Sequence, residues 1–135
     1  MKTSELTGDA LVCAVAMCEG YTNLHKIPGR LPHEPQWAMT PPRSEYGDME
    51  LWEIGSDCDW AFFGPIIERE GISVWENCGT SDPQPWSAIT GIKTWGDEGD
   101  DDRDESFGPT PLIAAMRCYV ASKLGDEVEI PEGVL

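Results

Sequence analysis

The sequence has few positively charged residues. Only nine of its 135 residues are lysine or arginine, against 25 aspartates and glutamates, which gives a formal net charge of −16. Proteins that hold nucleic acid or an anionic membrane through a basic face present clustered lysine and arginine. The composition therefore argues against direct binding of nucleic acid and against membrane binding. It favours a protein partner whose own surface is basic.

Long hydrophobic runs are also absent. No stretch approaches the roughly 20 apolar residues that a membrane-spanning helix needs, and the N-terminus lacks the basic-then-apolar pattern of a secretory signal. Five cysteines are scattered at positions 13, 18, 58, 78 and 118. An odd number of scattered cysteines predicts reduced thiols, so we expect a cytoplasmic protein.

The motifs of common enzyme families are missing as well. The sequence has no glycine-rich phosphate loop, no GxSxG nucleophile motif and no Cys-x-x-Cys zinc pair. The acidic run from Asp97 to Glu105 fails as an EF-hand calcium loop. Counted from Asp100, Glu105 stands where the loop needs glycine and Pro111 where it needs glutamate. The two histidines have only Glu34 as a neighbouring ligand. We expect no catalytic residue, no metal and no cofactor.

The most regular pattern in the sequence is a helix over Thr110–Leu124. Thr110 suits the N-cap, Pro111 the first helical position, and Gly125 the end of the helix. An apolar stripe with helical spacing runs through Ile113, Met116, Val120 and Leu124. Its flanks are apolar too, so we expect this helix to be buried on most sides and to form the core.

A second helix is predicted over Gly8–Glu19, with Thr7 as its N-cap. Shorter patterns predict a strand over Met49–Ile54, a helix from Pro65 to Gly71, and strands over Ile72–Glu76, Trp86–Trp95 and Asp126–Pro131. Together they predict one α+β domain over residues 1–135, in which both long helices pack on a short antiparallel sheet.

Two segments interrupt this pattern. Prolines at positions 28, 32, 35, 41 and 42 predict an irregular, partly extended, Pro-rich excursion over residues 21–48. Residues 96–106 carry seven acids and a single base. Because like charges repel and offer nothing apolar to bury, this segment is predicted to be a mobile acidic loop.

The candidate partner-binding residues are acidic or aromatic. We expect most of the six tryptophans to lie in the core, and we expect buried rings at Trp60, Phe62 and Phe63. Two tryptophans lie among prolines, where a partly exposed ring is available to a partner. The candidates are Asp97, Glu98, Asp100, Asp101, Asp102, Asp104, Glu105, Asp57, Asp59, Trp37 and Trp86. The alternative is that the acids are only solvated and the tryptophans only structural.

Three stretches carry a resemblance to a known family. They are the opening Met1–Gly8, Asp59-Trp60 with the following Gly64–Glu68, and the run from Gly108 to Pro131. Together they resemble the NinX-type family of small proteins from tailed phages and prophages of enteric bacteria. The excursion and the acidic loop depart from that pattern. The resemblance implies a phage accessory protein acting in the bacterial host cytoplasm, and it carries over no activity, cofactor or catalytic residue.

These observations predict a non-enzymatic protein that binds a host or phage protein. An acidic surface suits a basic groove that normally holds nucleic acid, as in a DNA mimic that blocks a defence or replication protein. Two alternatives stay open. One is a small hydrolase or nuclease whose carboxylates hold metal, and the other is a structural accessory component.

Overall fold

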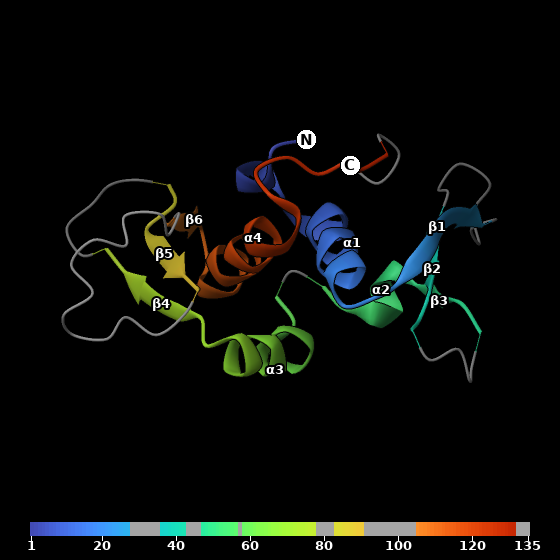
Figure 1. Cartoon of the computed structure of the whole chain (residues 1–135), viewed down its shortest axis with the longest axis horizontal. Helices are drawn as coiled ribbons and strands as arrows, with labels where there is room; N and C mark the ends of the chain where they lie inside the picture. Colours follow the sequence, from blue (N-terminus) through green and yellow to red (C-terminus); the bar gives the residue numbers. More distant parts are fainter. Residues whose placement is uncertain (28–35, 43–46, 57, 78–82, 91–104, 132–135) are drawn as a thin grey trace.

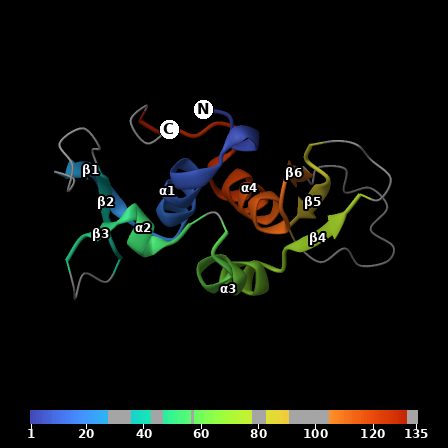
Figure 2. The same cartoon turned by 180° about the vertical axis from the view of Figure 1, so that it is seen from behind.

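Two long helices lie side by side in the middle of the molecule, with a small antiparallel sheet beyond each of them (Figures 1 and 2). The computed structural model describes residues 1–27, 36–42, 47–56, 58–77, 83–90 and 105–131. The predicted α+β class is confirmed. In chain order the elements are η1 (Thr3–Glu5), α1 (Gly8–Cys18), β1 (Thr22–Ile27), β2 (Gln36–Thr40), β3 (Met49–Glu50), α2 (Leu51–Ile54), α3 (Trp60–Glu70), β4 (Ser73–Glu76), β5 (Trp86–Ile89), β6 (Ser106–Gly108) and α4 (Pro111–Leu124).

The helix α4 begins and ends where the sequence predicts. The Thr110 hydroxyl accepts a hydrogen bond from the Ile113 amide at 3.2 Å, and Pro111 occupies the first turn. Gly125 follows the last turn with a φ of +87°, and its amide donates to the Ala121 carbonyl at 3.0 Å. All nine residues of Leu112–Val120 are buried. A helix that is apolar all round belongs in a core, and α4 is confirmed there.

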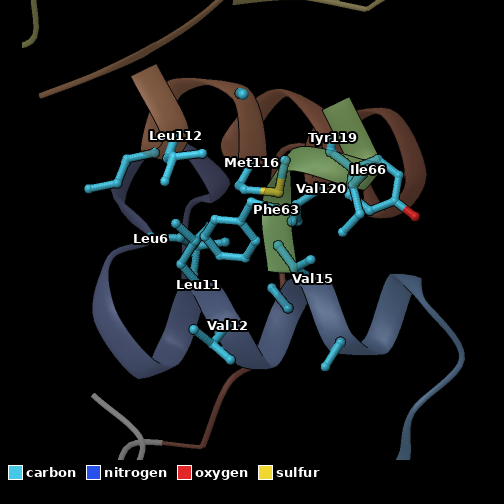
Figure 3. Packing of buried hydrophobic residues seen from close by; sticks show 14 of the residues in the cluster. Leu6, Leu11, Val12, Val15, Phe63, Ile66, Leu112, Met116, Tyr119 and Val120 are labelled. Atoms are coloured by element: carbon cyan, nitrogen blue, oxygen red, sulfur yellow. The ribbon is translucent and has the colours of Figure 1, made fainter. Parts of the chain in front are cut away.

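The helix α1 packs against α4 and shares its core. Ala10–Ala16 are all buried, and Figure 3 shows Phe63 of α3 lying between the side chains of α1 and α4. The predicted bounds of α1 are confirmed within one residue, and Thr7 is the N-cap residue as predicted, although its side chain does not cap the helix. The Thr7 hydroxyl makes no capping hydrogen bond, and its carbonyl accepts from the Leu11 amide at 3.3 Å instead.

The single predicted sheet is two sheets. One sheet has the strand order β4-β5-β6 and packs on α4. The other sheet has the strand order β1-β2-β3 and lies next to α2. A side chain at Gly108 would bring its Cβ within 2.6 Å of the Ala114 backbone nitrogen, so glycine permits β6 to lie directly against α4. The helix α1 lies between α4 and α2 rather than on the sheet of β4 to β6.

The Pro-rich excursion contains two strands that the sequence did not predict. β1 and β2 pair antiparallel, with Lys26 opposite Trp37. The prolines of this segment lie outside Thr22–Ile27 and Gln36–Thr40, so they bound the strands and remove no ladder hydrogen bond. Met39 of β2 is buried in the core, which fixes this sheet to the rest of the molecule.

The predicted strand over Met49–Ile54 is wrong beyond its second residue. Met49–Glu50 pairs with β2 as β3, and Leu51–Ile54 then forms the helical turn α2. The Glu50 amide donates to the Glu53 carboxylate at 3.3 Å. A glutamate three residues into a segment stabilises a helix start in this way, and here it outweighs the weak alternation.

The helix α3 begins five residues before the predicted start. The Asp59 carboxylate accepts from the amides of Ala61 at 3.0 Å and Phe62 at 3.3 Å, so this aspartate is the N-cap. Pro65 therefore lies inside the helix, where it lacks the N–H that would donate to the Ala61 carbonyl. Gly71 ends the helix in the left-handed conformation, as predicted.

The predicted C-terminal edge strand, Asp126–Pro131, does not form, and a single β-bridge stands in its place. Lys2 pairs with Glu127, and the Thr3 amide donates to the Asp126 carbonyl at 2.8 Å. The Thr3 hydroxyl also donates to the Gly125 carbonyl at 2.7 Å. The strand β5 confirms the start of the predicted strand Trp86–Trp95 but ends at Ile89, and residues 91–95 lie outside the described residues. Ser106, predicted in the acidic loop, begins β6.

Candidate functional site

The helix α4 carries a buried arginine that ties three separate segments together. The Arg117 side chain is 4% exposed. Its Nε donates to the Leu6 carbonyl at 2.9 Å, and its Nη1 donates to the Phe107 carbonyl at 2.8 Å and to the Gln84 side-chain oxygen. The N-terminal segment, the residues before β5 and the strand β6 therefore converge on one guanidinium group.

The acceptors around this guanidinium group are all neutral. Burial lowers the pKa of Arg117 from its usual value, and the nearby charge of Glu5 opposes that change. No described residue forms an ion pair with Arg117. Hydrogen bonds to three oxygens satisfy a buried cation in place of a carboxylate. This network holds Phe107 and Gln84 in fixed positions.

Beside this network lies a pocket of about 460 Å³, which we call the acidic pocket. It is lined by Lys2–Glu5, Gln84, Glu105–Phe107, Ala121 and Asp126–Glu127. The pocket brings together both ends of the described chain and the edge of the sheet next to α4.

The acidic pocket has an unbalanced charge. Four carboxylates line it, from Glu5, Glu105, Asp126 and Glu127, against the single ammonium group of Lys2. All four of these acidic residues are exposed, and none forms an ion pair with another described residue. Because these carboxylates repel one another and outnumber the nearby cations Lys2 and Arg117, a cation entering the pocket gains favourable electrostatic energy.

The sheet next to α4 has an outer face with exposed aromatic rings. Trp75, Ser87 and Phe107 are direct cross-strand neighbours on β4, β5 and β6. Their neighbours along the strands, including Ala88 and Gly108, lie on the face that contacts α4, so this row lies on the opposite face. We call the row the aromatic row. Trp75 is 38% exposed and Phe107 46% exposed.

The residue at the centre of the aromatic row is held by hydrogen bonds. The Asn77 side chain donates to the Ser87 hydroxyl at 2.6 Å, and the Trp75 indole donates to the Asn77 side-chain oxygen at 3.2 Å. Phe107 belongs both to this row and to the acidic pocket. Phe107 therefore connects the row to the pocket, while Ser87, between the two exposed rings, is fully buried.

Most of the acidic residues proposed from the sequence lie outside the described residues. These are Asp57, Asp97, Glu98, Asp100, Asp101, Asp102 and Asp104. Glu105 is described and lines the acidic pocket. Asp59 caps α3 and so has a structural role in the fold.

The two proposed tryptophans are partly buried. Trp37 and Trp86 both pack against the core, and Lys26 lies over the Trp37 ring at 5.3 Å. Among the tryptophans whose side chains the structure describes, the most exposed is instead Trp60, at 58%, so the expectation that its ring is buried is wrong. Trp60 opens α3 directly after the capping Asp59, a position where the ring projects from the first turn.

The sequence did not predict that Phe107, Glu5 and Arg117 belong to one site. Phe107 stands alone in an acidic stretch, and Glu5 and Arg117 are 112 positions apart. One signal was present: Arg117 is the lone charge within the apolar run Pro111–Ser122. A charge in such a position indicates either a bend toward solvent or a buried hydrogen-bond network.

A second charged cluster joins three helices. Arg69 of α3 forms a bidentate ion pair with Glu19, at 3.0 and 2.8 Å, and the Tyr119 hydroxyl of α4 donates to Glu19 at 2.8 Å. The hydrogen bonds from Arg69 and Tyr119 lower the pKa of Glu19 against the opposing effect of burial. The partners satisfy one another, so this cluster acts as a clamp within the fold.

The sequence matches the model of a known protein family. The family model described as bacteriophage P22, NinX, matches residues 2–123. The chain belongs to the bacteriophage P22 NinX family. The match confirms the resemblance seen in the sequence. A search among curated proteins finds no match.

The NinX family match covers almost all of the surface described above. It includes η1, β6, the aromatic row and all of α4 except Leu124, and it stops before Asp126 and Glu127. Among the described residues of this NinX-family chain, no helix has the length and apolar character needed to cross a membrane. The same residues contain no group of three or more histidine, cysteine, aspartate or glutamate side chains placed to hold a metal ion.

Proposed function

We propose that this NinX-family chain is a non-enzymatic phage accessory protein that binds a host or phage protein through that partner's basic surface. It acts in the cytoplasm of the bacterial host. The observation that carries the proposal is the acidic pocket, whose carboxylates form no ion pair with a described residue and adjoin the exposed ring of Phe107 on a chain of net charge −16.

The charge of the chain suits a groove that normally holds nucleic acid. Duplex DNA carries one negative charge per ~1.7 Å of helix axis, and a protein that binds it presents lysine and arginine at a matching density. A compact acidic protein offers such a groove a comparable field and speeds the encounter. Defence and replication proteins of the host have grooves of this kind, so the protein is proposed to act as a DNA mimic.

The exposed aromatic residues supply what charge alone lacks. Tryptophan and phenylalanine are enriched among residues that dominate binding energy, because each buries a large area at small entropic cost. Phe107 is exposed and lines the pocket beside its carboxylates, and the exposed Trp75 lies on the same face of the sheet, two strands away. This arrangement supports selective binding of one basic partner over many.

The test is affinity capture from host lysate at low and at high salt, followed by competition with duplex DNA for each captured protein. We expect partners that bind nucleic acid, are held more weakly at high salt, and are displaced by DNA. Partners whose binding ignores both salt and DNA would contradict the mimic. Divalent-dependent hydrolysis by the purified protein would favour the metal-dependent alternative, and stoichiometric incorporation into particles would favour the structural one.

A further inference from the structure

We propose that the acidic pocket and the aromatic row form one docking surface for a basic segment of the partner protein. A lysine or arginine side chain of that segment enters the pocket, and the segment's apolar atoms cover Trp75 and Phe107. This inference rests on the proposed function and names the surface and the chemistry by which the partner is bound.

The pocket supplies the charge complementarity. Four carboxylates and one ammonium group line it, which leaves an excess of three negative charges in the lining, and none of these carboxylates forms an ion pair with a described residue, although the charge of Arg117 acts on Glu5. Its volume of about 460 Å³ falls within the range of roughly 300–1,000 Å³ that ligand sites occupy. A flexible cationic side chain fits a site of this size and charge.

The aromatic row is an independent observation, because it does not depend on charge. Five large hydrophobic side chains are exposed in the described part of the chain, and two of them flank Ser87 on a single row. A cation over the face of an exposed aromatic ring gains attraction from its quadrupole. Phe107 stands at the pocket and on the row, so one segment can contact both.

The surrounding contacts favour an organic cation over a metal ion. A metal ion needs converging ligands at short distances, and no described group of three acidic, histidine or cysteine side chains is placed to provide them. Aromatic rings add nothing to the binding of a hydrated metal ion, whereas they pack against the carbon atoms of lysine and arginine.

Arg117 makes the pocket a preformed site. Its hydrogen bonds fix the Phe107 backbone and the Gln84 side chain, which are two parts of the pocket wall. Because these parts need no reordering when a segment binds, less entropy is lost on association. Arg117 is thus a positioning residue that the segment itself need not touch.

The experiment titrates the whole protein with an acetylated, amidated oligo-arginine peptide while backbone amide shifts are recorded by NMR. A matched peptide of citrulline, the neutral counterpart of arginine, serves as the charge control. We expect saturable shifts at Lys2–Glu5, Glu105–Gly108 and Ser73–Glu76 with the arginine peptide and none with the citrulline peptide.

Variants then separate the surface from the overall charge. Glu105→Gln and Glu68→Gln change the net charge equally, but Glu68 is exposed on α3 and outside the pocket. We expect Glu105→Gln and Phe107→Ala each to weaken peptide binding about threefold, in line with single ion-pair and cation–π contacts. Trp75→Ala should do the same, and Glu68→Gln should change affinity much less.

Equal weakening by Glu105→Gln and Glu68→Gln, or shifts spread over all acidic residues, would overturn this surface. That result would leave the proposed function standing, because a partner held by the overall field would still be captured in a salt-dependent way. Absence of any salt-dependent partner in the capture experiment would contradict the proposed function, whatever the peptide does.

Discussion

At the scale of single residues, the least expected side chain is Arg117. It points into a core of apolar residues, yet it remains satisfied because two carbonyls and an amide oxygen surround it. Removing it would take one hydrogen-bond donor from each of these three oxygens. An unsatisfied buried polar group costs about 1–3 kcal/mol, which exceeds the net gain from most single contacts.

Arg117→Met should therefore lower the free energy of unfolding by about 3 kcal/mol, since methionine keeps the apolar stem but donates to none of the three oxygens. Urea denaturation measures the change. Lys123→Met is the control, because Lys123 is an exposed cation on the same helix and surface changes usually stay within about 0.5 kcal/mol. Equal midpoints for Arg117→Met and the parent would show that the network carries no stability.

At the scale of elements, α4 organises the molecule. It contacts α1, α3, η1 and all three strands of the sheet next to it. Its caps and its apolar pattern were readable from the sequence, because both arise from neighbours within a few positions. What the sequence left open was the partner on each side of the helix.

A substitution at Met116 tests whether α4 is the central helix of the core. Its side chain is fully buried among α1, α3 and α4 (Figure 3). Met116→Asp removes a buried apolar group and adds an unpaired charge, so we expect a loss of at least ~3 kcal/mol.

Thermal melting followed by circular dichroism checks this, with Ser122→Asp as the control. Ser122 is an exposed residue of the same helix, so the control should lose about 0.5 kcal/mol or less. If Met116→Asp melted together with the parent, α4 would not be the core helix.

At the scale of the whole molecule, stability should fall in alkali because buried thiols resist ionisation. Burial raises the pKa of Cys13 to about 11, helped by the charge of Asp9, and burial raises the pKa of Cys18 to about 11. In the unfolded chain these thiols titrate near their usual value of 9.0. The stabilisation is therefore complete below pH 9 and is lost as the pH rises from 9 to 11.

Unfolding by urea at a series of pH values should show this loss as a falling free energy of unfolding. Each raised thiol contributes a slope of up to about 1.4 kcal/mol per pH unit. Cys13→Ala should make the decline shallower. Val15→Ala is the matched control, because it also shortens a buried side chain of α1 but removes no titrating group. Identical slopes in the parent and Cys13→Ala would contradict the assignment.

The sequence by itself determined the features that depend on near neighbours. The bounds of α1 and α4, the end of α3 at Gly71, the strand at β4 and the α+β class all follow from caps, glycines and apolar spacing within short windows. The strong negative charge and the family membership are likewise properties of the sequence.

Only the tertiary structure decided which distant segments meet. One pocket is lined by residues that are far apart along the chain, namely Glu5, Gln84, Phe107 and Glu127. They meet because Lys2 pairs with Glu127 after α4, and because Arg117 of α4 donates a hydrogen bond to the Phe107 carbonyl of β6. The division into two sheets has the same origin. Pairing between strands is non-local, so the alternation within a strand indicates which residues face the core but not which strand lies beside it.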